Sequence, residues 1–241
     1  MLAAFGLTFS AAARIIKREV RKMIRLLLFD FDGTLFETGP GVTNCVRYAL
    51  EKLGIHETDE GKLRKFIGPP LYDMFRELYG FDEETANEAV RLYRERYQPI
   101  GFLECAPYEG IIDLVDTVRR AGFKVSVCTG KPTPTTMRIL EHYDLVQHFD
   151  YVLGSEFDGT RSKKHEVVAD VLAHFGLSDQ PEQVRMIGDR KYDVLGAAKC
   201  GVKCIGVRFG YPEPGELEAA GAEYVADTVA ELQEYLLQLN S

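Results

Sequence analysis

Short apolar runs alternate with helical patterns along most of this chain, and this alternation is the feature that most restricts its fold. The first run, Ile24–Phe29, is too short for a helix and lacks the period of two that marks a half-buried strand. It is typical of a strand that is buried on both faces of a parallel sheet. Similar runs occur at Phe123–Cys128, Tyr151–Leu153, Val184–Ile187, Lys203–Val207 and Glu223–Val225.

Between these runs, apolar residues recur with the spacing of a helix. The helical segments are Ile111–Ala121, Pro134–His142, Lys164–Phe175, Lys191–Cys200, Glu216–Ala220 and Thr228–Leu239. This order predicts an α/β fold, a doubly wound (Rossmann-like) parallel sheet whose strands are joined by right-handed crossovers. We assign residues 23–37 and 108–241 to this core domain.

The alternation stops between residues 38 and 107, where the pattern is helical and no convincing strand occurs. The helical pieces are bounded by Gly54, Gly68-Pro69-Pro70, Gly80 and Pro99. This segment is far too long for an ordinary connection between a strand and a helix. We therefore expect an inserted α-helical cap domain, residues 38–107, over the carboxyl end of the first strand, where open α/β sheets bind their ligands.

Residues 1–22 precede the first strand and are apolar, then basic. A secretory signal has its positive charge before the apolar stretch, so this order argues against one. We expect an N-terminal extension without a function of its own, since Met23 stands directly before the strand. An organelle transit peptide is the alternative.

The charge balance bears on partners. Acidic residues outnumber basic ones by 37 to 29, which gives a net charge of −8. A general affinity for nucleic acid or for an anionic membrane is therefore not expected, and no apolar run approaches the ~18–20 residues of a membrane span. Five scattered cysteines without a CxxC pair indicate reduced thiols in a cytoplasmic protein.

The first candidate for chemistry is Asp30-Phe31-Asp32-Gly33-Thr34, directly after the first strand. Alternate side chains of an extended segment share a face, so Asp30 and Asp32 are expected to converge. Carboxylates this close repel each other unless a cation or a proton intervenes. The pair suits a hard-cation site or a nucleophile with an acid/base partner. The alternative is an ordinary surface turn.

Three further motifs follow later strands. Thr129 and Gly130 offer a hydroxyl and main-chain N–H groups for a phosphoryl oxygen, although helix capping is the alternative. Lys164 lies near the centre of its helix's apolar stripe, so it is expected to reach inward, whereas Lys163 points more than a quarter-turn away. Asp189 and Asp193 follow the fourth strand. Carboxylates, a hydroxyl and a lysine at successive strand ends favour phosphate chemistry, with a metal ion supplying positive charge.

Several other chemistries lack their motifs. The sequence has no GxxxxGK[ST] or GxGxxG, no HExxH, no GxSxG and no cysteine followed six positions later by arginine. A P-loop, a dinucleotide fingerprint, a zinc site, a serine-hydrolase elbow and a cysteine-dependent phosphatase loop are therefore not supported.

The four motifs together resemble the haloacid dehalogenase (HAD) superfamily of phosphohydrolases. They are DFDGT at 30–34, CTGK at 128–131, Lys164 within RSKKHEVV, and GDRKYD at 188–193. The helical insert resembles the type 1 cap of that superfamily. The C-terminal segment GVRFGYPEPGELEAAGAEYVAD resembles phosphoglycolate phosphatase-like members. One departure is Glu37, where relatives often have aspartate.

The resemblance implies a role for each matching residue. Asp30 would be the nucleophile that forms an aspartyl-phosphate, and Asp32 the acid and base. Substrate phosphate would contact Gly33, Thr129, Gly130 and Lys164. Mg²⁺ would bind Asp30, the main-chain carbonyl of Asp32, and Asp189. Asp193 would support these ligands without binding the ion itself.

The resemblance further implies a Mg²⁺-dependent phosphatase that hydrolyses a small phosphate monoester, most like phosphoglycolate phosphatase, as a monomer or homodimer. Asp32 favours ester chemistry, because dehalogenase members lack the second aspartate. The alternatives are a 5′-nucleotidase or pyrophosphatase and, further off, a sugar-phosphate mutase like β-phosphoglucomutase or a non-catalytic binding protein. In the cap we expect Arg64, Lys65, Gly68 and Arg94 to read the leaving group. The alternative for the three cations is solvated surface charge.

Overall fold

The computed structural model describes residues 23–240, so the proposed extension at residues 1–22 lies outside the described residues. A six-stranded sheet forms the core, in the order β5-β4-β1-β6-β7-β8, and every neighbouring pair is parallel. Its strands are β1 (Leu26–Phe29), β4 (Lys124–Pro132), β5 (Tyr151–Ser155), β6 (Val184–Gly188), β7 (Lys203–Val207) and β8 (Tyr224–Ala226).

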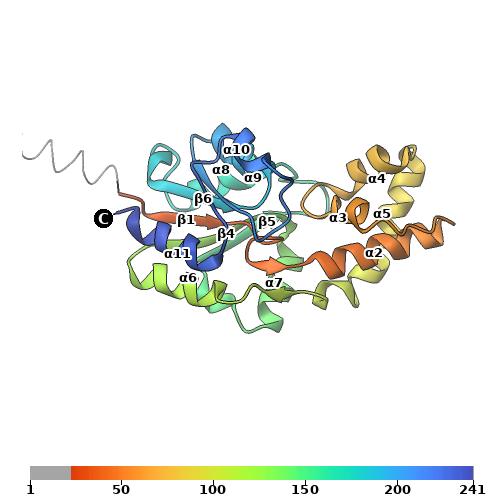
Figure 1. The fold of residues 1–241 in the computed structure, drawn as a ribbon, viewed down its shortest axis with the longest axis horizontal. Coiled ribbons are helices and arrows are strands. Elements are labelled where there is room, and N and C mark those ends of the chain that lie inside the picture. The colour runs from red at the N-terminus through yellow and green to blue at the C-terminus, as the bar shows by residue number, and fades with distance from the viewer. Residues whose placement is uncertain (1–22, 241) are drawn as a thin grey trace, which may run out of the picture.

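Helices cover both faces of this sheet (Figure 1). Side chains of β1 alternate between the two faces: Leu27 and Phe29 pack into one hydrophobic cluster, and Leu26 and Leu28 into the other. The first cluster includes residues of α6 (Ile111–Arg120), α7 (Thr133–His142) and α11 (Val229–Gln238). The second includes residues of α8 (Lys164–His174), α9 (Lys191–Lys199) and α10 (Glu216–Ala220). The predicted doubly wound fold is confirmed.

One strand differs from the expectation. Strand β4 continues past Cys128 to Pro132, because an irregularity in its register lets Pro132 pair with Ser155 of β5. The segment Thr129–Pro132 is therefore part of the sheet edge and not a plain junction between strand and helix.

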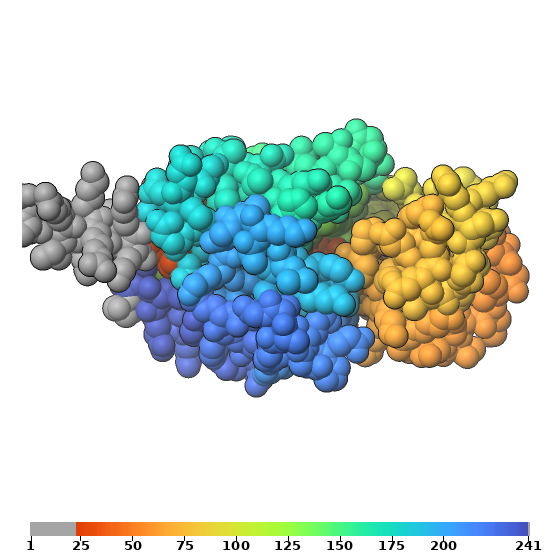
Figure 2. Space-filling model, turned by 90° about the horizontal axis from the view of Figure 1, so that it is seen from above, coloured from red at the N-terminus to blue at the C-terminus, as the bar shows by residue number. Residues whose placement is uncertain are grey.

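Four helices form the insert, and they lie as a lobe beside the sheet (Figures 1 and 2). They are α2 (Gly39–Lys52), α3 (Glu60–Arg64), α4 (Leu71–Tyr79) and α5 (Glu83–Tyr97). Asp59 and Asp82 cap two of them, since each side chain accepts a main-chain N–H three residues on, at 3.1 and 2.8 Å. Gly80 ends α4 in the left-handed conformation. The predicted helical pieces are thus present.

Two short strands connect this lobe to the core. Strand β2 (Phe36–Glu37) pairs antiparallel with β3 (Ala106–Pro107). The expectation that residues 38–107 contain no strand is wrong at β3, because a strand of two residues leaves no periodicity to detect. The domain boundaries at residues 37/38 and 107/108 stay predictions.

Candidate active site

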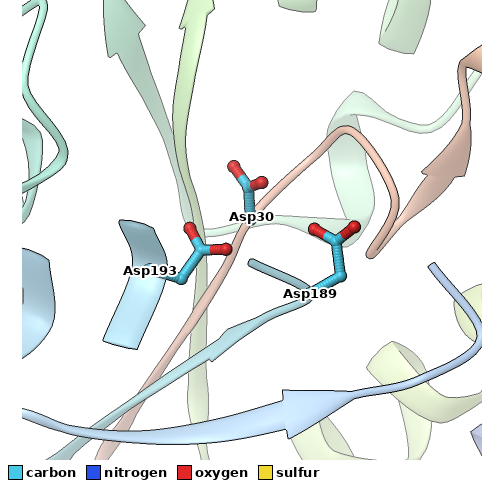
Figure 3. A group of neighbouring side chains, drawn as sticks. All are labelled: Asp30, Asp189 and Asp193. Atoms are coloured by element: carbon cyan, nitrogen blue, oxygen red, sulfur yellow. The ribbon is translucent and has the colours of Figure 1, made fainter. Parts of the chain in front are cut away.

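Three buried carboxylates meet at the carboxyl edge of the sheet (Figure 3). Asp30 follows β1, Asp189 follows β6, and Asp193 lies in the first turn of α9. Because β1 and β6 pair in register, Phe29 beside Ile187, the chain leaves both strands at the same place. One oxygen of each carboxylate lies within 4.8 Å of the others.

The oxygens of Asp189 show that this group suits a cation. Its Oδ2 accepts the main-chain N–H of Tyr211 at 2.8 Å. Its Oδ1 is buried, with no hydrogen-bond partner within residues 23–240. Burial, together with the neighbouring Asp193 and Asp30, raises the pKa of Asp189 well above its usual range. Carboxylate oxygens are preferred ligands of Mg²⁺, so an acceptor without a donor beside two further carboxylates fits this ion.

Lys164 stands between two of these carboxylates. Its Nζ lies 2.6 Å from Oδ1 of Asp30 and 2.7 Å from Oδ1 of Asp193, and it donates to the carbonyl of Cys128 at 3.2 Å. The close approach of α9 depends on Gly196, where a Cβ would lie 2.6 Å from Cβ of Lys164. Lys163 is exposed. The inward orientation of Lys164 is therefore as the helical phase predicts.

The two remaining carboxylates differ in their surroundings. Burial raises the pKa of Asp30 to about 6; Lys164 opposes this shift and Asp193 adds to it. Arg190 N donates to Oδ2 of Asp193 at 3.1 Å, and Nζ of Lys164 forms an ion pair with Oδ1 at 2.7 Å, although that oxygen has no partner with hydrogen-bond geometry within residues 23–240. That environment suits the supporting place the sequence gives to Asp193, whose role stays a prediction.

The charge of Asp32 is balanced by a different lysine from the one that contacts Asp30 and Asp193. Lys131 donates to both its oxygens, at 2.8 and 3.1 Å, and the two side chains are 7% and 14% exposed. Burial acts to lower the pKa of Lys131, but Asp32 and the phenol of Tyr97 together outweigh burial and raise that pKa above its ordinary value. The same Nζ lies 5.2 Å from the ring centroid of Tyr97 on α5. A helix of the insert thus contacts the partner of Asp32.

Lys131 is part of the CTGK motif, but the sequence predicted no role for it. The lysine belongs to the irregular end of β4, and Lys131 N donates to Oγ1 of Thr129 at 3.2 Å. A lysine directly after a candidate phosphate-binding Thr-Gly pair was the available signal. The contact of Lys131 with Asp32 could not be predicted from the sequence, because it depends on the irregular path of the backbone beyond Cys128.

The other proposed phosphate contacts lie around this edge. Gly33 adopts φ +79°, and a Cβ there would lie 2.1 Å from Oδ2 of Asp189, so the position requires glycine. Thr129 is buried beside Lys131. Gly130 is exposed, and its carbonyl accepts the hydroxyl of Ser155 at 2.6 Å. Their contacts with a substrate stay predictions.

The proposed specificity residues of the insert lie at its surface. Arg64, Lys65 and Arg94 are exposed, and the Arg94 guanidinium lies 5.8 Å from the ring centroid of Phe157. Gly68 borders a contact that sequence reasoning missed.

That contact is made by Arg190 of the core. It donates to the carbonyl of Ile67 at 2.8 Å and to Glu216 at 3.1 Å. The selection of substrates by the four insert residues stays a prediction.

Comparison with known proteins agrees with this geometry. A family model described as haloacid dehalogenase-like hydrolase matches residues 27–207. The chain belongs to this family. Among its haloacid dehalogenase-like relatives is a 5′-nucleotidase of Pseudomonas aeruginosa, 43% identical over 205 residues, which are 85% of this chain and 92% of that protein.

Other relatives carry different names. The tyrosine-protein kinase PtkA of Mycobacterium tuberculosis is 35% identical over 88% of this chain and 72% of its own length. Phosphoglycolate phosphatase 1 of Pseudomonas aeruginosa is 26% identical over 88% of this chain and 79% of its own. A crystal structure of a predicted phosphatase from Clostridium acetobutylicum has a TM-score of 0.84 and 40% identity, covering 90% of this chain and 99% of that one.

The predicted HAD superfamily is confirmed, as is the predicted class of a phosphoric monoester hydrolase. The relatives do not agree on one substrate.

Proposed function

We propose that this protein is a Mg²⁺-dependent phosphatase that hydrolyses a small phosphate monoester through an aspartyl-phosphate on Asp30. The observation that carries the proposal is the pairing of Lys164 with Asp30 at 2.6 Å, beside Oδ1 of Asp189, which no donor within the described residues 23–240 reaches. A carboxylate nucleophile, an ammonium for the phosphoryl oxygens and a vacant acceptor for a cation then share one buried edge. Phosphoryl transfer needs these parts together.

The first step forms the covalent intermediate. A carboxylate oxygen of Asp30 attacks phosphorus in line while the bond from phosphorus to the ester oxygen breaks. The departing oxygen takes a proton from Asp32, and the alcohol leaves. Lys164 and the hydroxyl of Thr129 bind the equatorial phosphoryl oxygens. Asp30, the carbonyl of Asp32 and Asp189 would hold Mg²⁺, which would offset negative charge on the phosphoryl group.

The second step regenerates Asp30. The Asp32 carboxylate accepts a proton from water, and the water oxygen attacks the phosphorus of the aspartyl-phosphate. The bond from phosphorus to the Asp30 oxygen breaks, and inorganic phosphate is released. Lys131 donates to both oxygens of Asp32 and so holds this side chain in place for both steps.

Two substrate classes come first. The C-terminal resemblance supports phosphoglycolate, a small ester with a carboxylate. The 43% identity to a 5′-nucleotidase supports a nucleoside 5′-monophosphate as the second candidate. A pyrophosphatase, a sugar-phosphate mutase and a non-catalytic binding protein are the remaining alternatives.

A panel of phosphate esters tests the proposal. Inorganic phosphate release is measured with Mg²⁺ for phosphoglycolate, nucleoside 5′-monophosphates, pyrophosphate, sugar phosphates and p-nitrophenyl phosphate, ranked by kcat/KM. Asp30→Asn, which keeps the size of the side chain, is expected to abolish release while its circular dichroism matches the wild type. Transfer of phosphate to another molecule without release, or full turnover by Asp30→Asn, contradicts the proposal.

We propose that the protein acts in the cytoplasm. All five cysteines are free thiols, as expected of a reducing compartment. Within residues 23–240, none of the helices has the length and apolar character that crossing a membrane requires. The net charge of −8 supports a small-molecule substrate and not nucleic acid or a membrane surface as the partner. We further propose that the protein is a monomer or homodimer.

A further inference from the structure

The two linkers of the insert both contact the loop that contains Tyr211. This residue lies in the loop between β7 and α10. Its hydroxyl oxygen accepts the main-chain N–H of Gly39, the first residue of α2, at 2.8 Å. The ring of Tyr108, directly after β3, packs edge-on against that of Phe209 in the same loop, with 5.1 Å between the ring centroids. One loop therefore contacts the start of the insert through Tyr211 and the return of the chain to the core through Phe209.

The bond to Gly39 meets a need of helix α2. The first N–H groups of a helix have no partner within it, and the residue before the helix commonly supplies one. Here Thr38 stands in that place, and its side chain makes no capping hydrogen bond in the described part of the chain. The acceptor comes from Tyr211. A Cβ on Gly39 would lie 2.8 Å from that hydroxyl, so glycine permits the approach.

The same residue also contacts the active site. The main-chain N–H of Tyr211 donates to Oδ2 of Asp189 at 2.8 Å. Its ring lies against Gly33, where a Cβ would be 2.8 Å from Cδ2 of the ring. Tyr211 thus contacts a proposed metal ligand through its main chain, the loop of the nucleophile through its ring, and the first linker through its hydroxyl.

We infer that Tyr211 is a positioning residue that couples the hinge of the insert to the metal-ligand end of the active site. The side chains of Asp30, Asp32, Lys131 and Lys164 are at most 14% exposed, so a substrate reaches them only if the insert moves. Such motion turns about β2 and β3, where the rigid ring of Tyr211 defines the closed position. The inference extends the proposed function and rests on it for its kinetic measurements only.

Tyr211→Phe separates the two sets of contacts, because it keeps the ring and the N–H to Asp189 and removes the hydroxyl. Hydrogen–deuterium exchange of the peptide containing Gly39 is expected to become several-fold faster. With the best ester of the panel, kcat is expected to fall roughly tenfold, since closure no longer fixes one geometry. The half-saturating Mg²⁺ concentration should stay within about twofold, because the main-chain bond to Asp189 remains.

Tyr108→Phe is the matched control. It removes a phenol hydroxyl from the other linker but leaves the bond from Gly39 to Tyr211, so exchange at Gly39 should stay near the wild-type rate. Wild-type exchange at Gly39 in Tyr211→Phe overturns the inference, as does faster exchange with unchanged kcat. A parallel loss of Mg²⁺ affinity, or faster exchange in β6 as well, also overturns it, because the hydroxyl then acts through the metal ligand or the whole fold. If the wild type releases no phosphate, the proposed function fails while the exchange result still decides the role of Tyr211 at the hinge.

Discussion

The ammonium of Lys164 lies 2.6 Å from the carboxylate of Asp30, and both side chains are 9% exposed. The same ammonium is 2.7 Å from Asp193, and Asp189 completes the acidic group. Three buried carboxylates therefore lie together with one lysine, which contacts two of them, and the pairing of Asp32 with Lys131 adds no net charge. Binding of a phosphate ester here requires that a cation or protons offset this negative charge.

The adjacent lysines at the start of α8 give a test of matched charge. Lys164→Ala is expected to lower kcat/KM roughly 100-fold or more, because the phosphoryl oxygens lose their ammonium in a buried site. Lys163→Ala removes the same charge one residue away at an exposed position and should leave kcat/KM within about twofold. Steady-state kinetics on p-nitrophenyl phosphate measure both. The reverse order of effects would contradict the assignment.

Lys131→Met should lower kcat/KM about 10- to 100-fold, since the buried carboxylate of Asp32 loses its cation. Lys124 lies on the same strand β4 and also forms an ion pair, with Asp150 at 2.7 Å, but its side chain is 63% exposed. Lys124→Met is therefore the control and should retain wild-type kinetics. Equal losses in the two variants would mean that β4 tolerates neither change and that Lys131 has no special part.

Mg²⁺ should stabilise the protein as well as activate it. At about 100 times its dissociation constant, a bound ion contributes about 2.7 kcal/mol, which raises the unfolding midpoint of a chain of this size by roughly 5–10 °C. Asp189→Asn should lose most of this shift, and chelation should abolish turnover reversibly. Differential scanning fluorimetry with and without Mg²⁺ measures the shift. Full turnover in excess chelator, or an equal shift in Asp189→Asn, is the opposing result.

Alanine variants of the three exposed cations of the insert test whether these residues bind the leaving group of the substrate. Arg64→Ala, Lys65→Ala and Arg94→Ala are compared on p-nitrophenyl phosphate and on the best ester of the panel. If one of them binds the leaving group, kcat/KM for that ester falls while the minimal substrate is hardly affected. Equal losses on both substrates would move specificity elsewhere. No loss on either would identify the cations as solvated charges, consistent with their exposure.

Asp150 links stability to pH at a place remote from the proposed metal site. It accepts Lys124 Nζ at 2.7 Å and the N–H of Val125 at 2.9 Å. Burial opposes its charge, but these bonds prevail and lower its pKa below the ordinary 3.8. A lowered folded-state pKa gives stability that is present above the unfolded value and is lost as pH falls through the folded one.

Asp150→Asn should therefore cost about 1 kcal/mol at pH 7, and the difference from wild type should narrow as pH falls below 3.8. Urea unfolding at several pH values measures it. A difference that stays constant down to pH 3 would show that the charge of Asp150 contributes nothing.

Local patterns in the sequence determine a large part of this protein. The continuous apolar run Ile24–Phe29 predicts a strand that is buried on both faces of a sheet. In the structure, side chains of β1 indeed pack into the hydrophobic clusters on both faces. The motifs at Asp30, Thr129, Lys164 and Asp189 are expected to meet, because parallel strands end at one edge of a sheet. Neither conclusion needs coordinates, since both follow from periodicity and chain order.

Only the tertiary structure decides which side chains touch at that edge. The pairing of Lys131 with Asp32 depends on an irregular register in β4, and the contact of Arg190 with Ile67 joins residues 123 positions apart. Tyr211 reaches Gly39 because a loop from the far end of the chain packs against both linkers. Such contacts leave no periodic trace in the sequence. They are set by how finished elements pack, where shifts of a few tenths of an ångström make or break a hydrogen bond.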